Sequence, residues 1–246
     1  MTMATIRADR SPVTAEETQA LAETGYFIRE QFFTSGELDE LEASADRAVA
    51  WRNGRFERYD DLFSQISTRD GFVFVNELYD DSPERDALRE FCLRPALRDM
   101  ARMLGGPNVA HCCYQLVYKF AGHEESMAWH QDEVNTPSDP PFFNMWIALS
   151  DMDVENGCLW TRPGAALDQV LPHHHTREGL SGWPLDDPDQ GIPLKMRRGD
   201  ICMMGSKTLH KSGPNFSERD RKAMLIIFMD RDAQIRGYTV PTIAYA

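Results

Sequence analysis

The stretch AHCCYQLVYKF, residues Ala110–Phe120, marks the point at which the sequence changes from helical to strand-like patterning. It is rich in aromatic residues and contains neither glycine nor proline, as is typical of a strand. Many short strands in succession predict a mainly β fold, a double-stranded β-helix or jelly roll with helices packed outside it. Five further segments of this kind follow, separated by turn residues: Phe143–Leu149, Cys158–Thr161, Ile192–Met196, Ile201–Met204 and Ala223–Met229.

The residues before this stretch are expected to form mainly helices. Thr14–Glu17 and Thr34–Glu37 are capping boxes, in which a threonine and a glutamate three residues later satisfy each other's backbone N–H groups at a helix start. Gly25 is expected to end the first helix. A short strand, Tyr26–Ile28, then precedes the second helix.

A third helix is expected to begin at Ser82 and to bend at Pro95. The sequence therefore predicts one domain across all 246 residues. Its mostly helical flank would cover residues 1–108, and its jelly-roll core residues 109–232. Residues 165–191 lack clear periodicity, and a loop of that length in a compact domain is often a lid or a binding loop.

Composition and charge narrow the classes of partner. Hydrophobic residues make up 42% of the chain, charged residues 26%, and the net charge is -13. An acidic surface repels phosphate backbones and anionic lipids, so we expect a small-molecule substrate rather than nucleic acid or a membrane. The oligomeric state is left open. No apolar run approaches the ~20 residues that cross a bilayer, and no signal-peptide pattern is seen, which predicts a cytoplasmic location.

The cysteines are odd in number and include no CxxC pair, so we expect reduced, mostly buried thiols. Cys112 and Cys113 are adjacent, and on a regular strand their side chains would point to opposite faces of the sheet. The full set is Cys92, Cys112, Cys113, Cys158 and Cys202.

Three residues indicate a metal site. His130 and Asp132 lie two residues apart, so on an extended chain their side chains project to the same side. A further histidine, His210, follows the predicted strand Ile201–Met204. Two imidazoles and one carboxylate on one face of an iron leave positions open for a 2-oxo acid and O2, which is the facial triad of non-haem Fe(II) oxygenases. A His-x-Asp tripeptide often arises by chance, so the rest of the sequence must show whether this one marks a metal site.

Arg221 supplies part of that context, because it lies after a turn that follows His210 and just before the predicted strand Ala223–Met229. A guanidinium there could reach back into the barrel and hold the distal carboxylate of 2-oxoglutarate through two parallel hydrogen bonds. Ser212 could add a hydroxyl to the same carboxylate. Arg219 is expected to be a solvated charge of the turn.

Several further motifs occur in order along nearly the whole chain. They are Gly25–Phe27, Trp129–Asp132, Trp146–Asp151, Glu155–Leu159, Pro163–Gly164 and His210–Asn215 with Arg221. This order resembles the phytanoyl-CoA dioxygenase family of iron(II)/2-oxoglutarate oxygenases. The resemblance implies a jelly-roll fold, iron at His130, Asp132 and His210, and both 2-oxoglutarate and O2 as cosubstrates.

By motif position, the resemblance also implies 2-oxoglutarate contacts from Arg221, Ser212, Lys119 and Trp146. Lys119 could equally be an exposed strand charge, and Trp146 could pack in the core while its indole forms the pocket wall. Gln115 lies on the same face of its strand as Lys119 and is a candidate pocket residue. Three residues that closely follow the metal motif are candidates for the substrate side: Glu133, Asn135 and Phe142.

The chain also departs from the family. Members often carry Lys-Pro-Pro where this chain has Lys119–Gly122, and the peroxisomal address of the eponymous animal enzyme is missing. The acidic charge argues against a coenzyme A thioester as substrate. Related halogenases have a small residue where this chain has Asp132, so oxygenation is favoured, with desaturation and ring formation left open. His173–His175 is interpreted as exposed or lid histidines rather than as a second metal site.

The expected reaction is oxidation of a C–H bond of a small metabolite, most simply hydroxylation, with decarboxylation of 2-oxoglutarate to succinate. Two other interpretations remain. A cupin-type metal dioxygenase that does not use 2-oxoglutarate would give Arg221 no necessary role. A non-catalytic binding module on the same fold would be expected to show a broken triad or a missing arginine, and the sequence shows neither.

Overall fold

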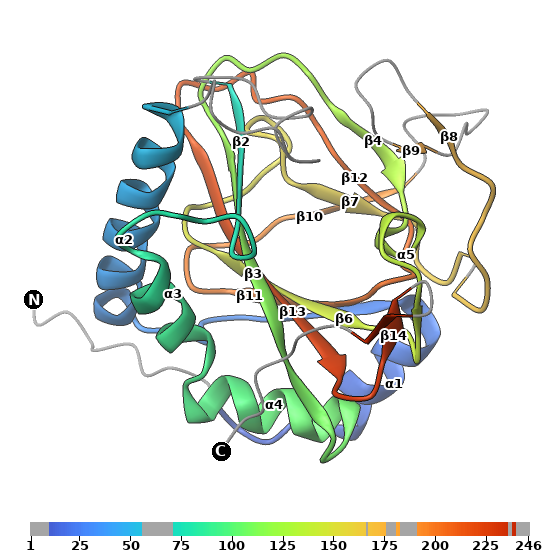
Figure 1. Cartoon of the computed structure of the whole chain (residues 1–246). Helices are drawn as coiled ribbons and strands as arrows, with labels where there is room; N and C mark the ends of the chain where they lie inside the picture. Colours follow the sequence, from blue (N-terminus) through green and yellow to red (C-terminus); the bar gives the residue numbers. More distant parts are fainter. Residues whose placement is uncertain are drawn as a thin grey trace, which may run out of the picture.

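Two antiparallel sheets form the centre of the computed structural model (Figure 1). The larger sheet contains β1 (Tyr26–Arg29), β2 (Phe72–Asn76), β3 (Val109–Lys119), β6 (Phe143–Ala148), β11 (Ile201–Gly205) and β13 (Arg221–Asp230), in the order β1-β11-β6-β13-β3-β2. The smaller contains β4 (Met127–His130), β7 (Leu159–Thr161), β10 (Ile192–Leu194) and β12 (His210–Ser212), in the order β10-β7-β12-β4. The structure describes residues 10–55, 71–165, 167–175, 181–182, 191–235 and 238–239.

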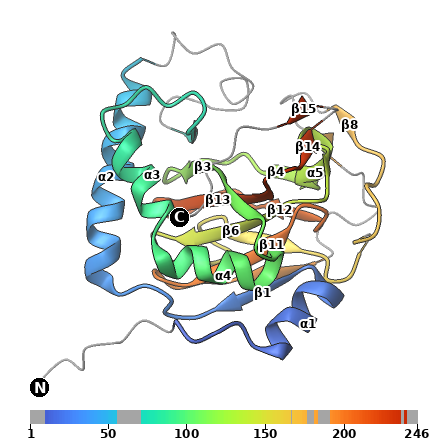
Figure 2. The same cartoon turned by 60° about the horizontal axis from the view of Figure 1, so that its bottom comes forward.

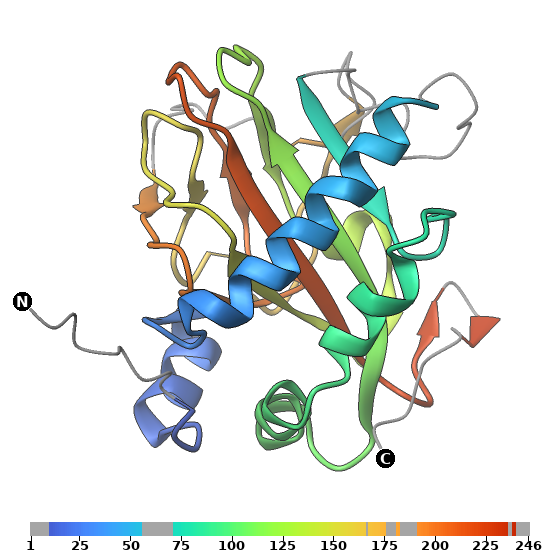
Figure 3. The same cartoon turned by 90° about the vertical axis from the view of Figure 1, so that its left-hand side faces the viewer.

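Helices cover the outer face of the larger sheet, which confirms the predicted jelly roll with flanking N-terminal helices. The long helix α2 (Ser35–Asn53) runs across that face, with α3 (Arg85–Cys92) beside it (Figure 3). The next helix, α4 (Pro95–Gly105), follows on the same side, while α1 (Ala15–Thr24) lies against β1 at the sheet edge (Figure 2). One apolar core fills the space between these helices and the sheet, and a second lies between the two sheets.

The helix boundaries follow the capping chemistry. Thr14 and Thr34 both form complete capping boxes at the starts of α1 and α2, as predicted. Gly25 ends α1 in the left-handed conformation, with φ 91°, and its N–H donates to the carbonyl of Leu21 at 3.1 Å. A side chain at this position would collide with Thr208, so the turn that leads into β1 requires glycine.

The single bent helix expected around Pro95 is two helices, so that prediction was wrong. The segment α3 ends at Cys92, and α4 begins at Pro95, which occupies the first helical turn. Proline lacks an N–H and clashes with the carbonyl four residues earlier, but it is well suited to a helix start. The chain therefore breaks the helix rather than bending it.

The strand β2 lies in the part of the chain that was expected to be helical. Its side chains alternate between the two cores: Val73 and Val75 pack under the helices, whereas Phe72 and Phe74 face the space between the sheets. This period-two alternation is the ordinary signature of a strand with both faces buried. The strand pairs with β3 and is the edge strand on that side of the larger sheet.

The adjacent cysteines do not point to opposite faces, which corrects the expectation from their spacing. The pairing of β3 with β13 shifts between Ile227 and Phe228, so one residue of β3 is unpaired there. Such a bulge breaks the alternation of side chains. Cys112 and Cys113 consequently share one small apolar cluster with Phe142. All five cysteines are free and buried, as predicted.

The remaining elements are short. A three-stranded sheet joins β5 (Ser138–Asp139), β14 (Gln234–Ile235) and β15 (Tyr238–Thr239), and β8 (His174–His175) pairs with β9 (Ser181–Gly182). The one-turn helix α5 (Asp132–Asn135) follows β4 directly. Among the described residues, no helix combines the length and apolar character needed to cross a membrane.

Candidate active site

Three predicted metal ligands converge at the edge of the smaller sheet. His130 ends β4 and His210 begins β12, and the two residues are direct partners in the antiparallel ladder between these strands. Asp132 begins α5. Its Oδ1 lies 3.7 Å from Nε2 of His130 and 3.9 Å from Nε2 of His210. The three candidate ligand atoms all lie within 4.8 Å of one another, which is the arrangement of two nitrogens and one oxygen that the sequence predicted.

Both imidazoles are held with Nε2 free for a metal. Nδ1 of His130 lies 2.8 Å from the carbonyl oxygen of Ala128, and Nδ1 of His210 lies 2.9 Å from that of Thr208. Only a protonated Nδ1 can donate to a carbonyl, so these contacts favour the tautomer whose lone pair is on Nε2. Burial, together with the nearby His210, lowers the pKa of His130 to about 4, which keeps this ring neutral and ready to bind a cation.

A cavity between the two sheets opens onto the three ligands. Its enclosed volume is about 130 Å³, and the empty space reaches about 1090 Å³ when the opening to solvent is counted. Apolar and aromatic side chains form most of its wall. Among the described residues that line it, Asp132 and Arg221 carry the charges.

Arg221 reaches this cavity from the first position of β13. Its side chain is 1% exposed, and its Nη1 donates to the carbonyl of Val117 at 3.0 Å. Its Nε and Nη2 have no hydrogen-bond partner among the described residues. The guanidinium lies over the ring of Trp146, with 5.4 Å from Cζ to the ring centroid. Burial lowers the pKa of Arg221 to about 10, so it remains a cation with donors to offer at neutral pH.

Lys119 and Ser212 lie beside the arginine. Lys119 is the ladder partner of Arg221 and is fully buried, rather than an exposed strand charge. Its Nζ donates to the hydroxyl of Ser212 at 3.1 Å and to the carbonyl oxygens of Glu125 and Gly213. Ser212 lines the cavity, whereas Lys119 lies behind it. Burial, followed by the charge of Arg221, lowers the pKa of Lys119 well below its ordinary value.

Four of the five remaining candidates line the same cavity, and the fifth does not. Trp146, Gln115, Asn135 and Phe142 all contribute to its wall. The indole Nε1 of Trp146 also donates to the sulfur of Met152, so this residue packs the core and forms the wall at once. Glu133 points elsewhere: its carboxylate accepts hydrogen bonds from the backbone N–H of Ser138 and the hydroxyl of Ser206. Its direction was set by α5, which the sequence pattern did not predict.

Gln131, between the two ligands of the His-x-Asp motif, anchors the start of the irregular segment 165–191. Its side chain donates to the carbonyls of Gln169 and Lys207 and accepts from the N–H of Leu171. Its backbone N–H donates to Nε2 of His173, 3.1 Å away. His173 is therefore partly buried against the metal motif. The side chains of His174 and His175, and residues 176–180 and 183–190, lie outside the described residues.

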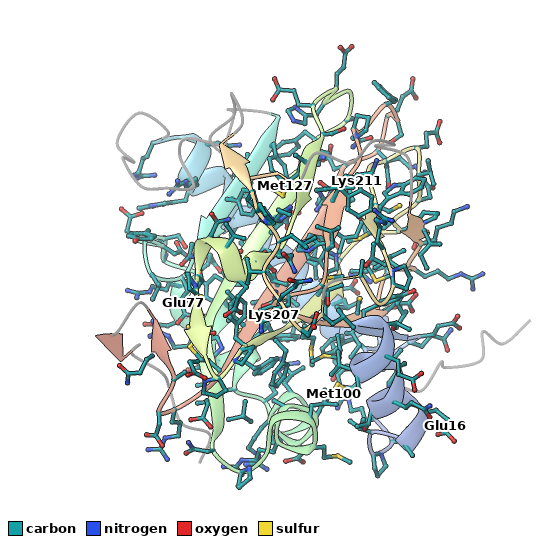
Figure 4. All side chains as sticks on the ribbon, turned by 90° about the vertical axis from the view of Figure 1, so that its right-hand side faces the viewer. Glu16, Glu77, Met100, Met127, Lys207 and Lys211 are labelled. Carbon is teal, nitrogen blue, oxygen red and sulfur yellow. The ribbon has the colours of Figure 1, made fainter. Side chains whose placement is uncertain are left out.

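Met127, which lines the cavity, and Lys211 lie on the neighbouring strands β4 and β12, far from Met100 on α4 (Figure 4). Lys211 lies over the rings of Trp129 and Trp160 on the smaller sheet. The cavity thus lies on the opposite side of the larger sheet from the helices.

Residues that the sequence analysis did not select also shape the site. Phe72 and Phe74 line the cavity from β2, and their alternation with valines was a usable signal for a strand. Asn144, on β6, donates from Nδ2 to Oδ2 of Asp132 at 2.6 Å. No pattern in the sequence identifies this asparagine, because its role depends on a residue of another element.

The residues present fit iron and 2-oxoglutarate. The donor set is that of a non-haem iron site, and a buried guanidinium with free N–H groups opens into the same cavity as the donors. The family model for phytanoyl-CoA dioxygenase (PhyH) matches residues 21–223. The chain belongs to the phytanoyl-CoA dioxygenase family. The complete triad in a member of this family makes the chain a 2-oxoglutarate-dependent non-haem iron oxygenase, as predicted.

Known relatives carry the family name, and solved structures share the fold. Phytanoyl-CoA dioxygenase domain-containing protein 1 of Rattus norvegicus is 25% identical over 255 residues, covering 85% of this chain and 87% of that protein. The α-ketoglutarate-dependent carbocyclase SnoK of nogalamycin biosynthesis has the same fold, with a TM-score of 0.71 at 21% identity over 92% of this chain and 87% of the other. So does the epimerase SnoN, solved with Fe3+, α-ketoglutarate and nogalamycin RO, with a TM-score of 0.69 at 21% identity over 89% and 84%.

Proposed function

We propose that this oxygenase hydroxylates a C–H bond of an uncharged small metabolite, with His130, Asp132 and His210 as the iron ligands. Iron and 2-oxoglutarate supply the oxidising chemistry when bound, and 2-oxoglutarate is converted to succinate and CO2. The observation that carries the proposal is the free Nε and Nη2 of Arg221 in the cavity that the three ligands share. A metal enzyme that did not use 2-oxoglutarate would have no need for this buried cation.

The 2-oxoglutarate end of the cavity is built to receive a carboxylate. The two free N–H groups of Arg221 can bind both oxygens of one carboxylate in parallel. Ser212 lies on the same wall, and Lys119 donates to its hydroxyl, which leaves the Ser212 proton available for a second acceptor. We infer that Arg221 and Ser212 contact the distal carboxylate and that Lys119 orients Ser212. Trp146 contacts the guanidinium through a cation–π interaction.

The opposite end of the cavity favours an uncharged primary substrate. Its described polar groups are neutral amides and a hydroxyl, from Gln115, Asn135, Thr136 and Asn144, next to the aromatic ring of Phe142. A charged substrate group placed there would lose its hydration without gaining an opposite charge, which is costly. The Oδ1 of Asn144 is buried and has no partner among the described residues, and it can only accept. A substrate hydroxyl or N–H would satisfy it.

The test is a screen for metabolites that stimulate succinate release from 2-oxoglutarate, followed by mass spectrometry of the product. The panel should pair each hydroxyl-bearing compound with its O-methyl ether, and should include coenzyme A thioesters. We expect stimulation by an uncharged hydroxylated compound, weaker stimulation by its ether, and a product heavier by one oxygen atom. A product of unchanged mass would indicate epimerisation, and a loss of two hydrogens desaturation or ring closure. Stimulation by the thioesters alone would contradict the proposed substrate class.

A further inference from the structure

The carboxylate of Asp132 has its two oxygens in different environments. Its Oδ1 faces Nε2 of both histidine ligands, at 3.7 and 3.9 Å, whereas its Oδ2 accepts the 2.6 Å hydrogen bond from Nδ2 of Asn144. A hydrogen bond to an ionised carboxylate is among the stronger ones in proteins. We propose that Asn144 is a positioning residue that holds Asp132 as a one-oxygen ligand of the iron.

The orientation of the Asn144 amide is determined by its partner. An ionised carboxylate can only accept hydrogen bonds, so the NH2 group and not the carbonyl of the amide must face Asp132. The side chain is 2% exposed and cannot exchange this partner for bulk water. Its backbone is equally constrained, because Asn144 lies on β6 with Met204 on one side of the ladder and Ile227 on the other.

Occupation of Oδ2 has a consequence for the metal site. An aspartate that binds through one oxygen uses one coordination position, whereas binding through both oxygens would use a second position and leave fewer for 2-oxoglutarate and O2. The side chain of Asp132 is 26% exposed, and the residue begins a helix of a single turn. The helix and the solvent around the carboxylate therefore restrain it weakly. Asn144 provides the restraint from β6, a buried interior strand of the larger sheet. This inference rests on the proposed iron site but not on the identity of the substrate.

The experiment is an anaerobic titration of the metal-free protein with Fe(II), then with 2-oxoglutarate, for the unsubstituted protein and Asn144→Leu. Leucine has a similar volume and no hydrogen-bonding group. Loss of a residue that orients a metal ligand typically weakens metal binding ~10–100-fold, and we expect a rise of that size in the apparent dissociation constant for Fe(II). The denaturant midpoint of the metal-free variant is measured in parallel to detect any loss of folding.

Asn76→Ala is the matched control. Asn76 is also a buried asparagine of the larger sheet, 4% exposed, and its Oδ1 accepts from the N–H of Leu78 at 2.9 Å, away from the cavity. This variant should lose stability but keep its Fe(II) affinity. Unchanged Fe(II) affinity in Asn144→Leu would overturn the inference, as would equal losses in both variants. If the unsubstituted protein itself bound no Fe(II), the proposed function would fail first.

Discussion

At the scale of single residues, the site depends on polar groups whose second contacts fix their direction. The carbonyls of Ala128 and Thr208 orient the two imidazoles, and Asn144 engages the remaining oxygen of Asp132. Arg221 differs from these residues because two of its nitrogens have no partner among the described residues. Buried unpaired donors are costly in a native protein, so their presence indicates a ligand that completes them.

Replacement of Arg221 by leucine should therefore weaken 2-oxoglutarate binding without loss of iron binding. Hydrogen bonds to a charged group contribute ~1.5–3 kcal/mol, which corresponds to a dissociation constant for 2-oxoglutarate roughly 10- to 150-fold higher. The measurement is an anaerobic titration of the iron-loaded protein with 2-oxoglutarate. Arg219→Leu is the control, because Arg219 lies two residues before Arg221 but is 53% exposed and paired with Asp153. Equal effects of the two substitutions would refute the anchoring role of Arg221.

The three candidate metal ligands and Arg221, which the structure brings to one cavity, could be selected from the sequence because their chemistry restricts the residue types and their motifs are ordered. The direction of a side chain could not be predicted where a turn or a bulge interrupts the regular strand. Glu133 follows Asp132 by one residue, yet the one-turn helix α5 directs it to Ser138 and Ser206 instead of the cavity. Asn144 was missed because its function comes from proximity to another element rather than from spacing within its own strand.

At the scale of secondary-structure elements, the cavity wall depends on a close approach of two loops. Gly157 has φ +82°, and a Cβ there would lie 2.7 Å from the carbonyl oxygen of Gly213 and 3.2 Å from the side chain of Lys119. Gly213 and Lys119 belong to the hydrogen-bonded group around Ser212, at the end of the cavity proposed to bind 2-oxoglutarate. The turn before β7 thus holds the end of β12 in place.

Gly157→Ala should reduce both stability and 2-oxoglutarate affinity. The left-handed backbone alone costs an alanine ~1–2 kcal/mol, and the collision adds to that cost by displacing Gly213. Gly122→Ala is a matched control, since Gly122 also has positive φ, +75°, but nothing lies within 4 Å of its Cβ position. Urea unfolding should show a larger loss for Gly157→Ala, and only this variant should bind 2-oxoglutarate more weakly. Identical behaviour of the two variants would contradict the contact.

The elements themselves were predictable where local chemistry specifies them and not where tertiary structure does. Both capping boxes and the stop at Gly25 are local, and the structure has them where expected. The strand β2 was missed because a short apolar run with both faces buried has no polar alternation, and only its aromatic and β-branched residues distinguish it from a buried helix. The bulge at Cys112 arises from pairing with β13 and has no signal in its own strand.

At the scale of the whole molecule, the buried metal site makes the metal-free protein sensitive to acid. Burial and the neighbouring His210 lower the pKa of His130 from 6.5 to about 4. Between these two values the unfolded chain binds a proton that the folded chain does not. The stability contributed by the neutral ring is therefore fully present above pH 6.5 and is lost as the pH falls toward 4.

The free energy of unfolding of the metal-free protein should accordingly fall between those pH values, by an amount on the order of 3 kcal/mol from this group. Urea titrations across this range give the measurement. In His130→Gln, which has no titrating ring at this position, that part of the decline should disappear. An identical pH profile for both proteins would show that His130 is already protonated, or not buried, in the folded state.

The central claim is that His130, Asp132 and His210 hold one iron to which 2-oxoglutarate binds from the side of Arg221. The most direct measurement is the visible charge-transfer absorption that forms anaerobically when a 2-oxo acid chelates protein-bound Fe(II). We predict a band that requires both iron and 2-oxoglutarate, saturates at one iron per chain, and is absent in His210→Ala. A band of full intensity in His210→Ala, or no band in the unsubstituted protein at saturating iron and 2-oxoglutarate, would contradict the claim.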